Sequence, residues 1–433
     1  MKIRSYISLT AVSASALALA ACGGGGSGSG SGTDSSSSTS STTSSAPTVA
    51  AFVNTALVSN TAAGTVDDLP ANTVASGDSN TFTFPKTQNS TLDPHLSHGW
   101  GVAFGPNSAV WVNDHASNLS SLYDGDGNLI PPSEQPAVAV PPNASGGVAG
   151  PTGIVANIET TQCPTIATST CAFGTGFSAG AGPAEFIFDG TGGTISAWAT
   201  GATAITEFDG SANGDSFTGL AIYTQSTGLT YLLATDFHNG EVDVFDSSFA
   251  PNQSAFPGAF HDPNLPAGYA PFGIQTIGNL IYVTYAKQPT TPGPEVDGEG
   301  LGLVDVYDGS GTLTKQLITS GGPLNAPWGV AMAPQGFGSY GGDLLIGNFG
   351  DGRINLFDPN TGSMLGTLQD ATTGKPIHIP GLWGIAFGNG VLNQSTTTLY
   401  YAAAPDMKTQ GLYGSIAPGA ASSGTGTPPP PGY

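Results

Sequence analysis

The chain has 433 residues, of which 30 are acidic and 8 are basic, so its formal net charge at neutral pH is −22. A charge of that sign repels phosphate backbones and anionic head groups, which argues against a nucleic-acid-binding protein. Glycine and proline are abundant, with 64 and 33 residues. No convincing amphipathic helix of more than two turns is found in the sequence, so it favours an all-β protein with many turns.

The first 22 residues have the pattern of a bacterial lipoprotein signal. Lys2 and Arg4 precede an apolar stretch, 7–19, and Leu-Ala-Ala then leads to Cys22. The stretch is shorter than a typical transmembrane helix, and its length is typical of the apolar part of a cleaved leader. The resemblance implies that the thiol of Cys22 is acylated and becomes the new N-terminus. We therefore expect an extracytoplasmic protein of the bacterial cell envelope, on the outer membrane or cell surface; an ordinary secretory signal is the alternative.

Two segments of biased composition flank the rest of the chain. Residues 23–46 are almost entirely Gly, Ser and Thr, and residues 419–433 are rich in proline. Such segments bury too little apolar surface to order themselves, so we expect a flexible tether and a disordered tail. The residues between them, 50–418, are expected to form one domain, because repeat-built β domains routinely exceed the usual domain length.

Two cysteines remain besides Cys22, namely Cys163 and Cys171. An even pair in an exported chain favours a disulfide, which would close a short surface loop. Metal binding or catalysis by the pair is the alternative interpretation.

A glycine followed by a short apolar run recurs six times, at intervals of 52 to 66 residues. A period near fifty that persists along the chain indicates a repeat architecture, and here each unit consists of strands. A glycine at the start of the innermost strand would allow close approach to a neighbouring backbone. The six positions are Gly101, Gly153, Gly219, Gly273, Gly329 and Gly384.

Each repeat predicts further strands after this inner one. The second is apolar at most positions, as expected for a strand buried on both faces, and the third ends in aromatic-Asp in most units. A fourth strand is expected in five units, including one near 253–256. The sixth unit has none, whereas the strand-like segment 52–58 has no unit of its own. We therefore predict a six-bladed β-propeller of four-stranded antiparallel blades, closed by an N-terminal strand.

The Pro-Trp-Gly-Val-Ala and aromatic-Asp-x-x-x-Gly motifs resemble those of NHL-repeat propellers. The region 50–418 is most similar to a family of uncharacterised secreted bacterial propellers, whose first blade opens on Asn-Pro-Trp-Gly-Ile-Ala. Here the segment 98–103 reads His-Gly-Trp-Gly-Val-Ala, so glycine replaces proline, and Val112-Asn-Asp114 follows. The wider fold group includes gluconolactonase-like hydrolases, amidating lyases and protein-binding scaffolds, so the resemblance implies a fold and not an activity.

In such blades, the start of the inner strand and the loop after the second strand lie on one face, around the axial channel. Aromatic rings with a few polar groups on this face are a candidate ligand site. For the tryptophans, packing between blades is the alternative role. The candidate ligand-binding residues are His98, Trp100, His115, His238, Trp328, Phe349 and Trp383.

Carboxylate and amide oxygens on the same face could bind a divalent cation such as Ca²⁺. The candidate ligands are Asp114, Asp236 and Asn348, with His115 and His238 nearby in sequence. A gluconolactonase-like enzyme uses an axial set of this kind to polarise a lactone carbonyl. No clear glutamate ligand occurs in the first repeat, which counts against that chemistry. The alternative is that these side chains cap turns and satisfy loop amides.

Three functions remain open from the sequence. The first is an envelope-anchored, monomeric binding module for a protein or carbohydrate ligand, attached to the membrane through Cys22. The second is a metal-dependent hydrolase or lyase, lactonase-like, with its metal in the axial channel. The third is a structural component of the envelope.

Overall fold

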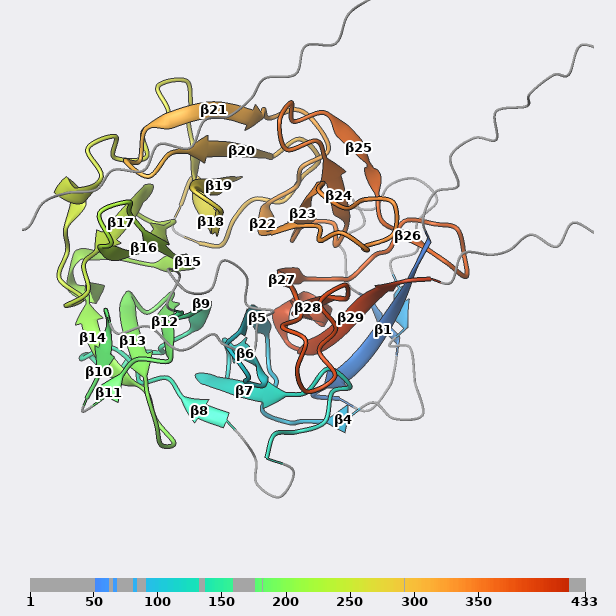
Figure 1. The fold of residues 1–433 in the computed structure, drawn as a ribbon, viewed down its shortest axis with the longest axis horizontal. Coiled ribbons are helices and arrows are strands. Elements are labelled where there is room, and N and C mark those ends of the chain that lie inside the picture. The colour runs from blue at the N-terminus through green and yellow to red at the C-terminus, as the bar shows by residue number, and fades with distance from the viewer. Residues whose placement is uncertain are drawn as a thin grey trace, which may run out of the picture. The chain divides into compact units, whose positions relative to one another are not determined.

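The structure is a ring of six small antiparallel sheets. The computed structural model describes residues 51–61, 65–67, 81–83, 91–131, 137–158, 176–180, 182–291 and 293–419. Among these, α1 (Pro405–Lys408) is the single α-helix. Figure 1 shows the six inner strands around the centre of the ring and the outer strands at its periphery. The predicted six-bladed β-propeller is confirmed.

The first three blades follow the chain from the innermost strand outwards. Blade 1 consists of β5 (Gly99–Phe104), β6 (Val110–Asp114), β7 (Leu119–Tyr123) and β8 (Ala137–Ala139). Blade 2 consists of β9 (Pro151–Ala156), β12 (Phe186–Gly190), β13 (Thr194–Trp198) and β14 (Ile205–Asp209). Blade 3 consists of β15 (Phe217–Thr224), β16 (Thr230–Asp236) and β17 (Glu241–Phe245).

The other three blades have the same order of strands. Blade 4 consists of β18 (Tyr269–Ile277), β19 (Leu280–Lys287), β20 (Gly302–Tyr307) and β21 (Leu313–Ile318). Blade 5 consists of β22 (Pro327–Met332), β23 (Leu344–Asn348), β24 (Ile354–Phe357) and β25 (Met364–Thr367). Blade 6 consists of β27 (Leu382–Phe387), β28 (Leu399–Ala403), β29 (Leu412–Pro418) and β1 (Ala51–Ser59).

Short elements decorate the blades. They are β2 (Thr65–Asp67), β3 (Thr81–Thr83), β4 (Thr91–Leu92), β10 (Ser178–Ala179), β11 (Gly182–Pro183), β26 (Gln369–Asp370) and the 3₁₀ turns η1 (Ser211–Asn213) and η2 (Gln253–Ala255). In the described part of the chain, none of the helices has the length and apolarity needed to span a bilayer. The predicted leader, tether and tail apart from Gly419, and with them Cys22, Cys163 and Cys171, lie outside the described residues.

Blade 3 corrects one prediction. The fourth strand expected near 253–256 is instead the 3₁₀ turn η2. Proline at 251 and 257 brackets this segment, and proline cannot donate to a sheet ladder. The edge of β17 is covered in another way, because the backbone N–H of Asn252 donates to the carbonyl of Val244 and the Gln253 side chain donates to that of Val242. A short irregular segment thus replaces the outer strand.

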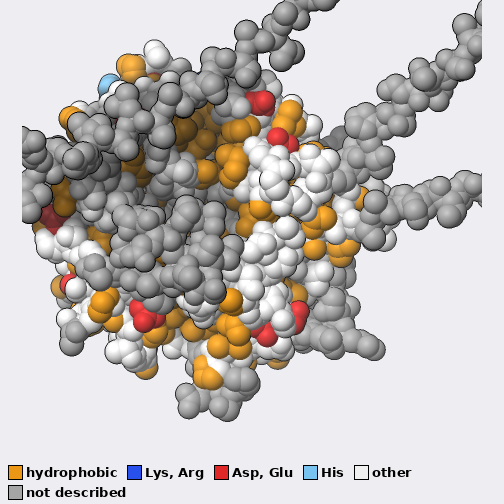
Figure 2. Space-filling view, viewed as in Figure 1, with side chains coloured by type: hydrophobic (Ala, Val, Ile, Leu, Met, Phe, Trp, Pro, Cys, Tyr) orange, Lys and Arg blue, Asp and Glu red, His pale blue; other side chains and the backbone are white. Residues whose placement is uncertain are grey.

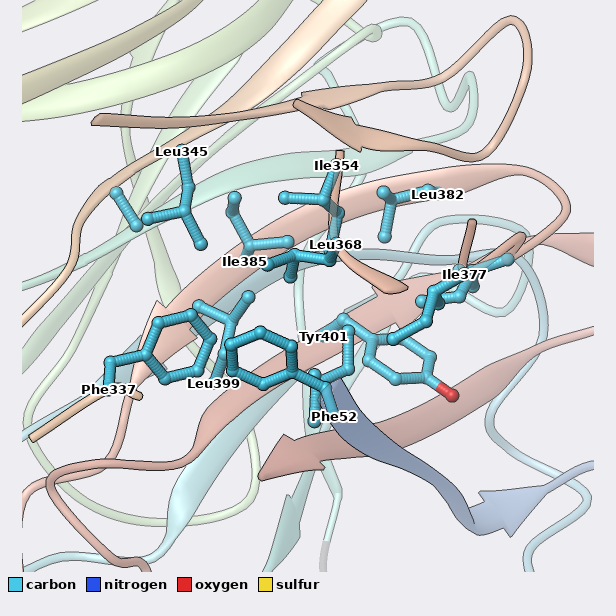
Figure 3. Packing of buried hydrophobic residues seen from close by; sticks show 14 of the residues in the cluster. Phe52, Phe337, Leu345, Ile354, Leu368, Ile377, Leu382, Ile385, Leu399 and Tyr401 are labelled. Carbon is cyan, nitrogen blue, oxygen red and sulfur yellow. The ribbon is translucent and has the colours of Figure 1, made fainter. Parts of the chain in front are cut away.

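The N-terminal strand closes the ring, as predicted. β1 pairs antiparallel with β29, from Phe52 opposite Pro418 to Ser59 opposite Leu412, and Figure 1 shows the two strands side by side. Figure 3 shows Phe52 among the buried side chains between blades 5 and 6. Its ring lies 4.6 Å from that of Phe337, and it is fully buried. The closing strand therefore supplies core as well as hydrogen bonds.

The repeated glycines mark places where the inner strands of neighbouring blades nearly touch. A Cβ atom on Gly101 would lie 2.3 Å from the carbonyl oxygen of Thr152, and one on Gly273 would lie 2.3 Å from that of Trp328. Gly219 is the loosest of the six, with its nearest neighbour at 3.1 Å. The close approach expected from the sequence is the reason for glycine at these positions.

Candidate functional site

The candidate site lies where the inner strands begin and the second strands end. Pairing places Gly99 opposite Asp114, Phe217 opposite Asp236, and Pro327 opposite Asn348. Since each blade uses the same register, these ends share one face around the axis, which we call the channel face.

The mouth of the channel is filled by an aromatic cluster. The ring of Trp383 is stacked on Trp100 at 3.5 Å and on Phe349 at 4.1 Å, and it meets Trp328 edge-on at 6.1 Å. Such stacked and edge-to-face pairs stabilise beyond the area that they bury. Trp383 is fully buried and Trp100 is 4% exposed. The members of the aromatic cluster are Trp100, Phe237, Phe272, Trp328, Phe349 and Trp383.

Trp328 crosses the channel axis. Its indole N–H, from blade 5, donates a hydrogen bond of 2.7 Å to the carbonyl oxygen of Thr218 in blade 3. Trp328 also lines a small cavity, whose surface is largely polar because backbone groups of the inner strands contribute to it, although Gln275 is its polar side chain besides the Trp328 indole. One aliphatic side chain from each blade lines this cavity, from the residue after each repeated glycine: Val102, Ile154, Leu220, Ile274, Val330 and Ile385. No carboxylate is among the described residues that line it, so these residues offer a cation only uncharged oxygens there.

Two histidines stack against the aromatic cluster. The rings of His98 and Trp100 lie 5.2 Å apart, and His98 and His115 lie 4.5 Å apart. Burial, His115 and Lys408 lower the pKa of His98 to about 2. Burial and Lys408 lower the pKa of His115 to about 4. Both imidazoles are therefore neutral near pH 7, and Nε2 of His115 lies 3.0 Å from the Thr191 hydroxyl.

Three ring nitrogens in this region are buried without a hydrogen-bond partner among the described residues. They are Nε2 of His98, Nε1 of Trp100 and Nε1 of Trp383. Buried polar groups normally find partners, so three together mark a place where polar contacts are incomplete.

Lys408 covers the aromatic cluster from the helical turn α1. Its ammonium lies 4.3 Å from the centroid of Phe349 and 5.4 Å from that of Trp383. It also lies 2.7 Å from Oε1 of Glu295, whose side chain is only 5% exposed. The ion pair joins the loop after β19 in blade 4 to blade 6 across the mouth of the channel.

The three predicted metal ligands lie in separate hydrogen-bond networks. Asp114 accepts a 2.5 Å bond from the Ser121 hydroxyl, and burial raises the pKa of its carboxyl well above the usual range. Asn348 donates to the carbonyl of Pro323. Oδ1 of Asp236 accepts from the backbone N–H groups of Ser216, His238 and Asn239, as a turn cap would. The structure does not gather the three into one set, and their metal role stays a prediction.

Asp236 has acidic neighbours that the sequence did not single out. Carboxylate oxygens of Asp215, Asp236 and Asp243 lie within 4.8 Å of one another, and this acidic group could hold a metal ion. Burial, Glu241, Asp236 and Asp215 raise the pKa of Asp243 to about 7. The alternation of β17 places Asp243 on the same face as Glu241, and that pattern is the signal that could have revealed it.

The predicted ligand-binding residues divide into two sets. Six of them meet at the mouth of the channel: His98, Trp100, His115, Trp328, Phe349 and Trp383. His238 does not lie there, because its side chain is exposed and lies beside Gly214, on the side of the acidic group. Lys408 and Glu295 were missed, because both lie in connections that have no counterpart in the other repeats.

Comparison with known proteins gives a family but no activity. No protein-family model matches the sequence. The chain is 31% identical over 338 residues to the uncharacterized protein R648 of Acanthamoeba polyphaga mimivirus, covering 76% of this chain and 77% of that protein. It therefore belongs to the family of that protein. The uncharacterized mimivirus protein L690 is 37% identical over 188 residues, which is 43% of this chain and 48% of L690. The predicted relation to bacterial propellers is thus not supported by these relatives.

Solved structures with similar folds include several enzymes. A virginiamycin B lyase from Staphylococcus aureus, solved with quinupristin, has a TM-score of 0.42 and 13% identity, over 84% of this chain and 98% of the lyase. The calcium-binding protein regucalcin from Agrobacterium tumefaciens has a TM-score of 0.44 and 10% identity, over 75% of this chain and 90% of regucalcin. At such identities the similarity concerns the fold and not the chemistry of a site.

Proposed function

We propose that this protein is a binding module whose ligand docks on the channel face. The observation that carries the proposal is the filled mouth of the channel, where Trp328 crosses the axis and Trp383 stacks between Trp100 and Phe349. A packed aromatic surface with neutral histidines and one ion pair suits recognition of a ligand with ring or cationic groups. A metal held inside the channel would find no carboxylate or imidazole among the described lining residues.

Our proposal for the location of the module rests on the leader predicted from the sequence. We propose an extracytoplasmic, membrane-attached, monomeric protein, anchored through Cys22 to the envelope of a bacterial cell. Figure 2 supports the choice of partner, because scattered acidic side chains and no basic ones are visible on the described part of the face shown. Neutral or cationic partners fit this surface, whereas nucleic acid does not. Incorporation of a fatty-acid label in the full chain, lost in Cys22→Ser, tests the anchor.

A second candidate function is favoured by the acidic group. We propose that Asp215, Asp236 and Asp243 hold a divalent cation such as Ca²⁺, which would offset the mutual repulsion of their charges. The site would be structural or serve a hydrolase or lyase with its metal at the rim of the channel face. Metal content of the purified chain by mass spectrometry is the direct test, and Asp243→Asn should remove a bound ion.

The binding proposal is tested by tryptophan fluorescence. Three of the five tryptophans lie in the aromatic cluster, whereas Trp111 and Trp198 pack together between blades 1 and 2. Amines, sugars and peptides are titrated into the purified chain. A ligand of the channel face should change the emission in Trp111→Phe as in the wild type, and less in Trp328→Phe. If no compound changes the emission in either protein, and cross-linking captures nothing, the binding role is wrong.

A further inference from the structure

The channel face holds one ammonium group by three independent contacts. The ammonium of Lys408 lies 2.7 Å from the Glu295 carboxylate, over the ring of Phe349 at 4.3 Å and over that of Trp383 at 5.4 Å. Aromatic faces attract cations through their quadrupole, and the attraction grows when water is excluded. We call Glu295, Phe349 and Trp383 the ammonium site.

The ammonium site is built without the help of α1. Phe349 follows β23, Trp383 belongs to β27, and Glu295 lies in the loop between β19 and β20. The two rings are already held together by their own stacking at 4.1 Å, and Trp383 is held by Trp100 behind it. With Lys408 in place, the side chain of Glu295 is only 5% exposed, and a carboxylate at such a position requires a cationic partner. The site is therefore able to accept a different ammonium.

The segment that carries Lys408 has the character of a strap that can be displaced. α1 has only four residues, and no side chain caps its first turn. Asp406 and Lys408 have φ angles of +56° and +68°, in the left-handed region that non-glycine residues rarely occupy. Such a conformation persists only while its surroundings hold it. The surroundings that hold it are the contacts of the Lys408 ammonium and backbone hydrogen bonds such as that from Gln410 N–H to the Pro405 carbonyl.

We propose that Lys408 occupies the ammonium site as an internal substitute for an external organic ammonium group. This ligand would be the lysine side chain of a partner or a small quaternary amine, and either would displace α1 from the mouth of the channel. The inference rests on the proposed binding function and names the chemical class of its ligand. Because the internal lysine competes at a high effective concentration, the wild type should bind such ligands weakly.

The test removes the internal competitor. In the full chain, Lys408→Ala and Lys408→Met should each bind tetramethylammonium or Nα-acetyl-lysine methylamide at least tenfold more tightly than the wild type does, by calorimetry and tryptophan fluorescence. The methionine variant keeps most of the apolar stem, so it guards against loss of folding. Adding Glu295→Gln to either variant should reverse the gain. Lys287→Ala is the matched control, since Lys287 also lies over a ring, that of Tyr269 at 4.9 Å, away from the cluster.

Each outcome decides a point. Tighter binding of tetramethylammonium alone identifies a small quaternary amine, and tighter binding of the lysine derivative alone identifies a lysine side chain; both support the inference. Equal binding of uncharged 3,3-dimethylbutanol overturns it, since the site would then be merely apolar. Folded Lys408 variants that bind no ammonium better than the wild type also overturn it. If sugars or neutral peptides still bind the channel face, the binding function survives and only the ammonium assignment falls.

Discussion

Two regions of the channel face differ in what stabilises them. On the side of blades 5, 6 and 1, the aromatic cluster packs Trp383 between Trp100 and Phe349 and leaves two histidines neutral. On the side of blade 3, Asp236 and Asp243 lie in a group of like charges, and the charged side chains that raise the pKa of Asp243 are all acidic. The first region should be indifferent to metal cations, whereas the second should depend on them. Equivalent positions of the repeat therefore differ in their dependence on metal ions, because the residues around them differ.

The largest expected effect lies in the aromatic region. Trp383→Ala removes a fully buried ring that contacts Trp100, Trp328 and Phe349. Loss of a buried aromatic side chain costs about 3–5 kcal/mol in the free energy of unfolding, so urea denaturation should show a loss of that order. A loss under about 1 kcal/mol for Trp383→Ala would mean that the cluster is not part of the core.

Gly101 and Gly219 allow a matched comparison of the same repeat position. Gly101→Ala would place its Cβ 2.3 Å from a backbone oxygen, so the inner strands of blades 1 and 2 must separate. Overpacking of this kind costs about 1–3 kcal/mol. Gly219→Ala, at 3.1 Å from its nearest neighbour, should cost less than half as much. Equal losses in thermal unfolding would contradict the view that strand contact explains the glycines.

The fold could be predicted because each of its determinants recurs. Each inner strand has a glycine where its backbone contacts the next blade. Because this pattern occurs six times, the interpretation of one such glycine is supported by the other five. The closing strand was predictable by elimination, since 52–58 had no blade and blade 6 had no outer strand. Blade 3 escaped the rule because prolines at 251 and 257 stop an otherwise suitable segment from pairing.

The site was only partly predictable, for a physical reason. Trp100, Trp328 and Trp383 occupy equivalent positions, so their convergence on the axis follows from the repeat. Lys408 and Glu295 lie in loops of blades 6 and 4 that share no pattern, and their 2.7 Å contact depends on three-dimensional closure. The separation of Asp114 from Asp236 has the same origin, since each carboxyl accepts hydrogen bonds from groups of its own blade.

The acidic region should respond to both charge removal and cations. The pKa of Asp243 is raised to about 7, so its carboxyl destabilises the fold when ionised, and this cost is present above pH 7 and absent near pH 4. Asp243→Asn should therefore raise the stability by about 1–2 kcal/mol at pH 8 in EDTA, and by much less at pH 5. Calcium should raise the melting temperature of the wild type and not that of Asp243→Asn.

Asp114 supplies the control for that experiment. Asp114→Asn should leave the calcium response intact, because its carboxyl belongs to a different network, with Ser121. A calcium response that is lost in Asp114→Asn and kept in Asp243→Asn would instead restore the axial metal set predicted from the sequence. Absence of any response to calcium, with no metal in the purified chain, would remove the cation from the proposal.

The smallest expected effect is that of His115, whose contribution to stability changes with pH in the direction opposite to that of Asp243. The folded state holds the pKa of His115 at about 4, below the usual value of 6.5, so the unfolded chain takes up the proton first as the pH falls. Stability due to this group is complete above pH 6.5 and declines toward pH 4, by at most about 1.4 kcal/mol per pH unit. His115→Gln should flatten the fall in stability between pH 7 and 5.5 by about 1 kcal/mol in total. As the pH falls over the same range, protonation of Asp243 makes the protein more stable, whereas protonation linked to His115 makes it less stable. The double variant His115→Gln, Asp243→Asn removes both effects, so the pH dependence of its stability should return toward that of the wild type. An unchanged slope in His115→Gln would show that this imidazole is open to solvent, and with it the mouth of the channel.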